Sequence, residues 1–103
     1  MPLSPVEAAH RVNEQVTVEM QVKAAKNCQR CSLMFLDSEE DHHDPKNFAV
    51  AVTEGGRARF TQMKIDDPAS HFKGKTIRVT GVVTVKDNQP QIEVDTPRQI
   101  EVV

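Results

Sequence analysis

The chain has 103 residues, which is enough for one domain over residues 1–103 with a single hydrophobic core. Hydrophobic residues make up 38% and charged residues 27% of the chain, a balance that is typical of globular domains and excludes a disordered one. The 13 lysines and arginines face 15 aspartates and glutamates, so the net charge of −2 argues against a strong, sequence-blind nucleic-acid binder.

Signals for a membrane or for a disulfide framework are missing from the sequence. No apolar run approaches the roughly 18 residues that cross a bilayer, and the opening MPLSP lacks the basic and apolar segments of a signal peptide. A chain trimmed of a signal peptide would look the same, so we predict no membrane association and leave the compartment open. Two cysteines are too few for a disulfide framework.

The first predicted element is a short helix that begins after Ser4. Ser4 can cap the helix, Pro5 suits its first position, and Glu7 stands where a capping-box carboxylate would. We expect the helix to end near Asn13, because asparagine tolerates the left-handed conformation that closes helices. Its expected buried stripe consists of Val6, Ala9 and Val12.

Two strands are predicted next, because hydrophobic residues recur with a period of two. The first starts at Gln15, and its expected buried residues are Val16, Val18, Met20 and Val22. Residues 24–30 are predicted to form a loop and residues 31–36 the second strand. The two expected faces of this second strand are Leu33 with Phe35 and Met34 with Leu36.

A polar loop is predicted over residues 37–47, and a third strand follows it. The loop carries five acidic residues, Asp37, Glu39, Glu40, Asp41 and Asp44. In the third strand the expected inward residues are Phe48, Val50 and Val52. Ala49 and Ala51 are expected to point outward.

A helical insert is predicted after the third strand, where Gly55 and Gly56 interrupt the sheet. Residues 57–63 form a helical turn in this prediction, and its expected buried residues are Phe60 and Met63. The sequence Asp66-Asp67-Pro68 offers a second helix start that leads to Phe72.

The longest predicted strand spans residues 76–86, with Ile77, Val79, Val83 and Val85 facing inward. Gly81 in its middle suggests a bulge or bend. Asp87 and Asn88 predict a hairpin turn, after which Pro90 opens a return strand. The inward residues expected in the return strand are Ile92 and Val94, and those of a last apolar edge are Ile100 and Val102.

This order predicts an all-β fold, a five-stranded antiparallel OB-type barrel with a short N-terminal helix and a helical insert between strands 3 and 4. Residues 71–81, HFKGKTIRVTG, and the later PQIEV and QIEVV segments resemble small bacterial OB-fold domains of the tRNA-anticodon-binding-like type. The opening EAA and VTV segments are similar to the same family's start. The resemblance covers nearly the whole chain, and it implies nucleic acid as the presumed ligand.

Residues for a nucleic-acid groove can be named, because OB barrels usually bind on strands 2 and 3, between the loops that join strands 1 to 2 and 4 to 5. These loops offer Lys23, Lys26, Arg30, Lys86, Asn88 and Gln89. Single-strand binders also use exposed aromatic platforms, but this chain has no Trp and no Tyr. Its four phenylalanines are expected mostly in the core, and the acidic loop adds negative charge nearby. Composition therefore argues against the groove, and only the resemblance favours it.

A zinc site is the second candidate. Cys28 and Cys31 have the two-residue gap with which paired thiolates chelate zinc, and His42 and His43 could complete a tetrahedral site. The two pairs lie in successive loops, which a strand holds apart at opposite ends of the barrel. A redox role for the cysteines is less well supported, because Cys31 enters a strand rather than a helix whose dipole would lower its pKa.

The sequence therefore predicts a non-catalytic OB-fold binding module whose candidate ligand is single-stranded DNA or RNA. No nucleophile, general base and orienting group can be named together, so no enzyme and no cofactor is predicted. Two alternatives stay open. One is a protein-interaction or structural module, and the other is a small zinc-binding domain that uses Cys28 and Cys31.

Overall fold

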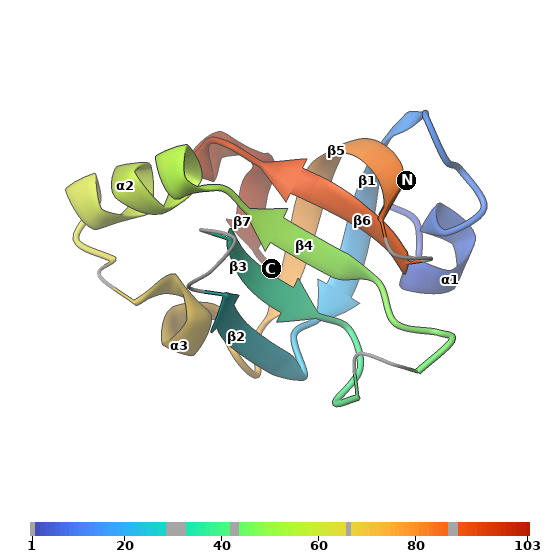
Figure 1. Cartoon of the computed structure of the whole chain (residues 1–103), viewed down its shortest axis with the longest axis horizontal. Helices are drawn as coiled ribbons and strands as arrows, with labels where there is room; N and C mark the ends of the chain where they lie inside the picture. The colour runs from blue at the N-terminus through green and yellow to red at the C-terminus, as the bar shows by residue number, and fades with distance from the viewer. Residues whose placement is uncertain (1, 29–32, 42–43, 66, 87–88) are drawn as a thin grey trace.

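The structure, a computed structural model, describes residues 2–28, 33–41, 44–65, 67–86 and 89–103. Its elements in chain order are α1 (Pro5–Ala8), β1 (Gln15–Gln21), β2 (Ala24–Cys28), β3 (Leu33–Asp37), β4 (Ala49–Val52), α2 (Glu54–Gln62), α3 (Pro68–Phe72), β5 (Thr76–Lys86), β6 (Gln89–Val94), the 3₁₀ helix η1 (Pro97–Gln99) and β7 (Ile100–Val102). Strands dominate, as predicted, and the helices are few and short (Figure 1). No helix of the described residues is long and apolar enough to span a membrane.

All seven strands belong to one sheet in the order β1-β5-β6-β4-β3-β2, with β7 beside β5. No strand pairing of the described residues joins β1 to β2, so the sheet is not closed and the predicted five-stranded barrel is not confirmed. The antiparallel prediction fails for one pair, because β4 and β6 are parallel. Between these two strands the chain runs through the helical insert and β5. This connection returns the chain to the end of the sheet at which β4 starts, so β6 can run parallel to β4.

The N-terminal helix begins as predicted and ends earlier. The Glu7 backbone N–H donates to Ser4 Oγ over 3.2 Å, and the Ser4 N–H donates to Glu7 Oε1 over 3.0 Å, which completes a capping box. Because the helix stops at Ala8, it has no long apolar stripe. Ala8 is the buried residue, whereas Val6 and Val12 are exposed, contrary to the prediction.

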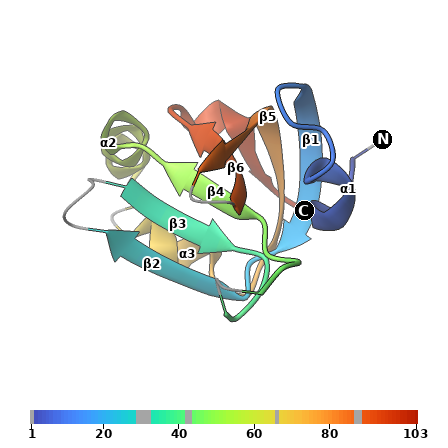
Figure 2. The same cartoon turned by 45° about the vertical axis from the view of Figure 1, so that its right-hand side comes forward.

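Residues 24–28 form strand β2, so the loop predicted over residues 24–30 is wrong there. β2 pairs antiparallel with β3, from Ala24 opposite Asp37 to Cys28 opposite Leu33 (Figure 2). Its sequence, AAKNC, has no apolar alternation and few β-favouring residues. The ladder with β3 supplies the strand character that local sequence does not predict.

The core contains the alternating residues of the first strands, with Val18, Met20 and Val22 almost fully buried. Phe60 of α2 and Phe72 of α3 pack edge-to-face in it, with ring centroids 5.5 Å apart. Met63, which was expected inside, is 58% exposed because α2 ends at Gln62. The insert lies between β4 and β5 in the chain, as predicted.

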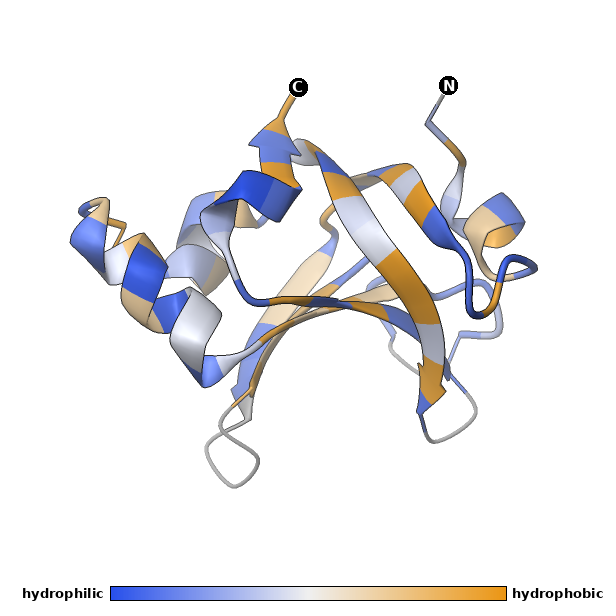
Figure 3. Ribbon diagram, turned by 90° about the horizontal axis from the view of Figure 1, so that it is seen from above, coloured by the Kyte–Doolittle hydropathy of each residue, from blue (hydrophilic) through white to orange (hydrophobic). Residues whose placement is uncertain are grey.

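The long strand β5 has the predicted bounds, and its apolar and less apolar residues alternate (Figure 3). It pairs with β1 up to Val82 and with β6 from Val83, so it links the two parts of the sheet. Gly81 lies at this changeover, where an added Cβ would come within 2.5 Å of Ile92 Cγ2. The glycine therefore permits close packing of β5 on β6. Val85 lies beyond the β1 ladder and is exposed, contrary to the prediction.

The N-terminal segment covers part of the outer edge of β1. The Leu3 N–H donates to the Thr17 carbonyl over 2.8 Å, and the Glu19 N–H donates to the Leu3 carbonyl over 2.9 Å. These bonds make a parallel bridge between Leu3 and Val18. The middle of β1 is thereby paired on both of its edges.

Candidate nucleic-acid interface

The strands β2, β3, β4 and β6 present one continuous face away from the core, which we call the outer face. The inward residues of β3, β4 and β6 include Met34, Val50 and Ile92, all fully buried in the core. Side chains alternate along a strand, so the residues between them point to the outer face. Strand register aligns these outward residues in two rows. The platform row is Lys26, Phe35, Ala51 and Glu93, and the polar row is Ala24, Asp37, Ala49 and Gln91.

Phe35 is the aromatic residue of the platform row. Its side chain is half-buried, whereas the four phenylalanines were predicted to lie mostly in the core. Lys26 lies opposite it on β2 and is exposed, and Ala51 lies opposite it on β4. An aromatic ring beside a lysine can stack on a base while the ammonium group meets a phosphate.

The outward residues of β4 are two alanines, whose side chains project little from the outer face. Ala49 and Ala51 are 4% and 0% exposed and stand apart from the core cluster, so their neighbours on the outer face cover them. The sequence predicted their outward direction correctly but not their burial. Because a methyl group projects little from the sheet, Phe35 projects further than its neighbour on β4.

The polar row ends in a buried hydrogen-bond network. Asn47 Nδ2 donates to Asp37 Oδ1 over 3.2 Å and lies 3.5 Å from Gln89 Oε1. Asn47 Oδ1 accepts from the Glu39 N–H over 3.1 Å, and Ser38 Oγ accepts from the Phe48 N–H over 2.8 Å. These bonds attach Ser38, Glu39 and Asn47 to the starts of β4 and β6. The acidic residues of the predicted polar loop therefore lie at one end of the outer face.

The structure places four of the six predicted groove residues and disperses them. Lys26 lies in the platform row, while Lys23 lies beyond the start of β2 and forms an ion pair with Glu39 over 3.4 Å. Lys86 and Gln89 are opposite each other where β5 and β6 meet, and Gln89 contacts Asn47. Arg30 and Asn88 are outside the described residues. Of the four residues that the structure describes, Lys26 alone lies directly beside Phe35.

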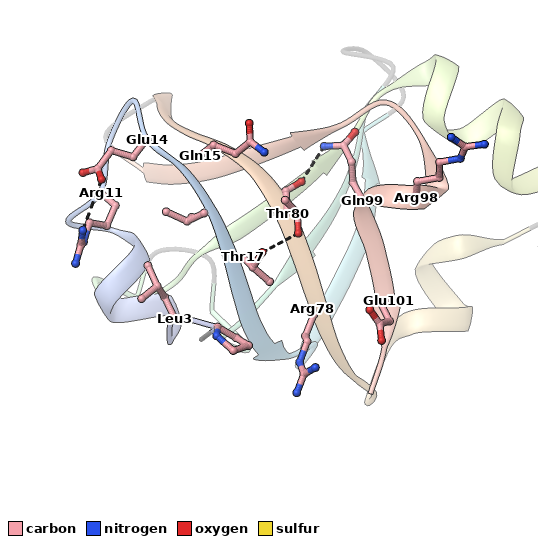
Figure 4. A pocket seen from close by; sticks show the side chains of 12 residues that line it. Leu3, Arg11, Glu14, Gln15, Thr17, Arg78, Thr80, Arg98, Gln99 and Glu101 are labelled. Atoms are coloured by element: carbon pink, nitrogen blue, oxygen red, sulfur yellow. Dashed lines mark hydrogen bonds and ion pairs between the residues drawn. The ribbon is translucent and has the colours of Figure 1, made fainter.

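A shallow hollow of about 610 Å³ lies away from the outer face, over β1, β5 and the 3₁₀ helix. The Thr17 and Thr80 hydroxyl groups are hydrogen bonded over 2.9 Å on its floor. Arg78 pairs with Glu19 over 2.8 Å, and Arg11 lies 3.6 Å from Glu14. The arginine side chains point away from the centre of the hollow (Figure 4). Its lining contains no aromatic residue, so it lacks the stacking surface of the outer face.

The zinc hypothesis is not tested by the described residues. Cys31, His42 and His43 are outside them, and no group of three or more potential metal ligands occurs among the residues that are described. Cys28 pairs with Leu33 at the start of β3, whereas residues 38–41 follow the end of that strand. Cys28 and residues 38–41 thus lie at opposite ends of β3.

The features of the outer face that sequence analysis missed depend on register. The run from Leu33 to Leu36 is wholly apolar, so its composition does not reveal which side chains face the core. Glu93 and Gln91 come from a strand more than 50 residues later. The period of two in β6 could have indicated their outward direction, but not their place beside β4.

Comparisons with solved structures show the fold. Asparaginyl-tRNA synthetase from Pyrococcus horikoshii matches 99% of the chain with a TM-score of 0.67 and 15% identity. Aspartyl-tRNA synthetase from Entamoeba histolytica and a putative aspartyl-tRNA synthetase from Leishmania major Friedlin each match 100% of the chain, with TM-scores of 0.64 and 0.63 and identities of 18% and 11%.

The chain spans only 20–23% of the length of these synthetase chains. No family model and none of the curated proteins compared matches the sequence. At these identities the likeness concerns the backbone alone, and it agrees with the OB-type fold that the sequence predicted. The predicted resemblance to bacterial domains remains a prediction, because the solved structures named here come from other organisms.

Proposed function

We propose that the chain is a non-catalytic OB-fold module that binds single-stranded nucleic acid on its outer face. The observation that carries the proposal is the pair of Phe35 and Lys26, which are opposite each other in register on β3 and β2. The ring offers a stacking surface for a base, and the ammonium group offers a charge for the phosphate beside it. OB folds bind on their strands 2 and 3, which correspond to β3 and β4 in this chain, and Lys26 borders that surface from β2.

We also infer that β1 and β2 act as the two halves of one OB-type first strand. Only Val22 and Lys23 separate them, and the Val22 and Lys23 N–H groups donate to the carbonyls of Lys75 and Asp37 over 2.9 and 3.0 Å. The chain thus passes from the ladder with β5 to the ladder with β3 within two residues. On this view β7 is an addition to a five-stranded plan.

RNA is the first ligand class that we propose. The matched solved structures are tRNA synthetases, and this domain corresponds to about a fifth of each of their chains. That supports a role in RNA binding for the same backbone arrangement. The aminoacylation that their names describe concerns whole proteins several times longer.

The net charge of −2 limits how such binding can work. A face with one or two phosphate contacts gains little from counterion release, so most of the affinity must come from stacking. Stacking of one base on an aromatic side chain contributes about 1–3 kcal/mol. We therefore expect weak to moderate binding with a shallow dependence on salt, unlike that of a basic, sequence-blind binder.

Fluorescence anisotropy of labelled single-stranded RNA and DNA of about ten nucleotides tests the proposal. Replacing Phe35 with Leu keeps an apolar side chain on β3 and removes the aromatic face. We expect the variant to bind at least fivefold more weakly, which corresponds to the lower end of the stacking contribution. Val82→Ala is the matched control, because Val82 is also an exposed strand residue but belongs to the β1–β5 ladder.

The two outcomes have different consequences. Equal affinity of the Phe35→Leu variant and the wild-type chain would remove the stacking platform from the proposal. If the wild-type chain binds neither RNA nor DNA at low salt, nucleic-acid binding itself is wrong. A protein partner would then be the first hypothesis to test.

A further inference from the structure

Charged residues are separated along the strands of the outer face. β4 and β6 start beside residues 38–41 and 44–47 and end near α2 and η1 (Figure 1). The end beside the loop, which we call the acidic end, carries Glu39, Glu40, Asp41 and Asp44. The opposite end, which we call the basic end, carries Arg57 and Arg59 on α2 and Arg98 on η1.

The hydrogen bonds of Asn47 hold the acidic end in place. Asn47 fixes the Glu39 backbone and the Asp37 side chain, and Asp44 Oδ1 accepts the Lys46 N–H over 2.8 Å. Lys23 forms an ion pair with Glu39, and Lys46 is a second cation at this end. Four acidic residues, Glu39, Glu40, Asp41 and Asp44, against these two lysines leave the acidic end with a formal negative charge.

The basic end is held close to the outer face by packing of α2 on β6. The Thr53 N–H donates to the Val94 carbonyl over 3.0 Å, and an added Cβ on Gly56 would come within 2.6 Å of the same oxygen. α2 also contacts η1, and Arg98 points toward α2 (Figure 4). The start of α2 thus borders the end of β6 directly.

The three arginines at the basic end are available to a ligand. Within the described part of the chain, none of them makes an ion pair or a side-chain hydrogen bond, whereas Arg11 and Arg78 are both paired. Arg57 and Arg59 flank the buried stripe of α2, so one guanidinium lies on each side of the helix. Glu54 and Asp95 are also at this end, so its three arginines and two carboxylates give a formal charge of +1. The Asp95 carboxylate accepts from Thr53 Oγ1 over 2.7 Å.

Both ends are close enough to act on a ligand at Phe35. Asp37 is two residues from Phe35 along β3, and Thr53 is two residues from Ala51 along β4. A strand rises about 3.3 Å per residue, so each end begins about 7 Å from the platform row. The charged side chains lie beyond these two points, so their effect at Phe35 is largest at low salt, where the Debye length rises from about 8 Å at physiological salt to about 30 Å. At low salt, a phosphate beside Phe35 therefore experiences repulsion from one side and attraction from the other.

We propose that this charge gradient determines the direction in which a bound strand leaves Phe35. This inference rests on the proposed function and deepens it. The phosphates pass toward Arg57, Arg59 and Arg98 and away from the acidic end, so a short strand binds in one orientation. Arginine suits this role because its planar guanidinium group can donate two hydrogen bonds to one phosphate.

Charge-neutralising variants of the two ends test the proposal by anisotropy with the same labelled RNA. We expect Arg57→Gln/Arg59→Gln/Arg98→Gln to bind about tenfold more weakly at low salt and to lower the salt slope by roughly 0.7 for each phosphate contact that is lost. Glu40→Gln/Asp44→Asn should bind two- to fivefold more tightly, with the gain shrinking as salt is raised. Arg98→Gln alone, in an exposed turn, gives a smaller loss without perturbing α2.

Arg11→Gln is the matched control for Arg98→Gln, because it also removes one positive charge from an exposed side chain, but near α1. If the Arg98 variant and the triple variant bind like this control while Phe35→Leu still loses affinity, the direction is wrong and the proposed function stands. If the wild-type chain binds no oligonucleotide but binds a polyglutamate peptide through these arginines, the basic end serves an acidic protein partner and both proposals fall.

Orientation has a direct readout in NMR. Two six-nucleotide RNAs carry a nitroxide at the 5′ or the 3′ end, and each is bound to the isotope-labelled wild-type chain. We expect one label to broaden the backbone amides of α2 and η1 and neither label to broaden those of residues 39–41. Equal broadening of both ends of the outer face by both labels would overturn the single orientation.

Discussion

Asn47 and Asp37 form a buried pair where the outer face meets the acidic end. The Asn47 Nδ2 group donates to Asp37 Oδ1 over 3.2 Å, and the two residues are 2% and 3% exposed. Asn47 also accepts a hydrogen bond from the Glu39 N–H. One amide side chain thus satisfies a buried carboxylate and fixes the backbone of an acidic segment.

Replacing Asn47 with Ala should destabilise the fold. The change leaves the buried Asp37 carboxylate without this donor, a loss that costs about 1–3 kcal/mol. Urea unfolding followed by circular dichroism measures it as a lower midpoint with an unchanged slope. Lys46→Ala, at an exposed neighbouring residue, is the control. An Asn47→Ala variant as stable as this control would show that water replaces the amide.

The adjacent glycines of α2 should respond oppositely to Ala. A Cβ on Gly55 has no atom nearer than 4.0 Å, so Gly55→Ala should stabilise the helix by about 0.5 kcal/mol. A Cβ on Gly56 would lie 2.6 Å from the Val94 carbonyl oxygen, and Gly56→Ala should cost about 1–3 kcal/mol. Thermal unfolding compares the pair. Equal melting temperatures would contradict the close packing of α2 on β6.

The N-terminal capping box should be visible in the titration of Glu7. The hydrogen bonds from the Ser4 backbone N–H and hydroxyl group, and then the charge of Arg11, lower the pKa of Glu7 below its ordinary value of 4.5. A lowered pKa means that the ionised form stabilises the fold above the unfolded-state pKa. This contribution is lost as the pH falls through the folded-state pKa.

NMR titration of the Glu7 carboxyl carbon checks this prediction. Ser4→Ala removes the hydroxyl group, so the pKa of Glu7 should rise toward its ordinary value. Arg11→Gln should raise it less, because the arginine is the weakest of the three causes that lower it. A Glu7 titration that is the same in the Ser4→Ala variant and the wild-type chain would contradict the capping box.

Removal of metal ions should leave the fold unchanged. Cys28 lies opposite the start of β3, whereas residues 38–41 follow the end of that strand. At 3.3 Å per residue, the two ends of β3 are about 13 Å apart. We therefore expect the same melting temperature with and without EDTA. A large decrease in the presence of the chelator, accompanied by stoichiometric zinc in the purified protein, would restore the zinc-binding alternative.

Much of the fold could be predicted because the strands that line the core alternate clearly. Thr76–Lys86 was predicted with its observed bounds, and the insert was placed between the correct strands. β2 was missed because Ala24–Cys28 is a strand only through its ladder with β3. The parallel pairing of β4 and β6 could not be predicted either, since local sequence does not specify which distant strand will be a neighbour.

The candidate interface was predicted less well than the fold. Loop cations were chosen by analogy, yet Lys23 is paired with Glu39, and Lys86 lies at the far end of β5. Phe35 was expected in the core because strand alternation favoured mostly buried positions for the four phenylalanines. Its outward direction depends on Met34 and Leu36, which already fill the core at that strand.

The short segment around Leu3 has a consequence for how copies of this chain meet. An unpaired strand edge is a template on which another chain can add a strand and begin to aggregate. Leu3 occupies the Thr17 carbonyl and the Glu19 N–H of β1, so an incoming strand finds the centre of that edge already taken. The segment around Leu3 thus prevents another copy of the chain from adding a strand along the middle of β1.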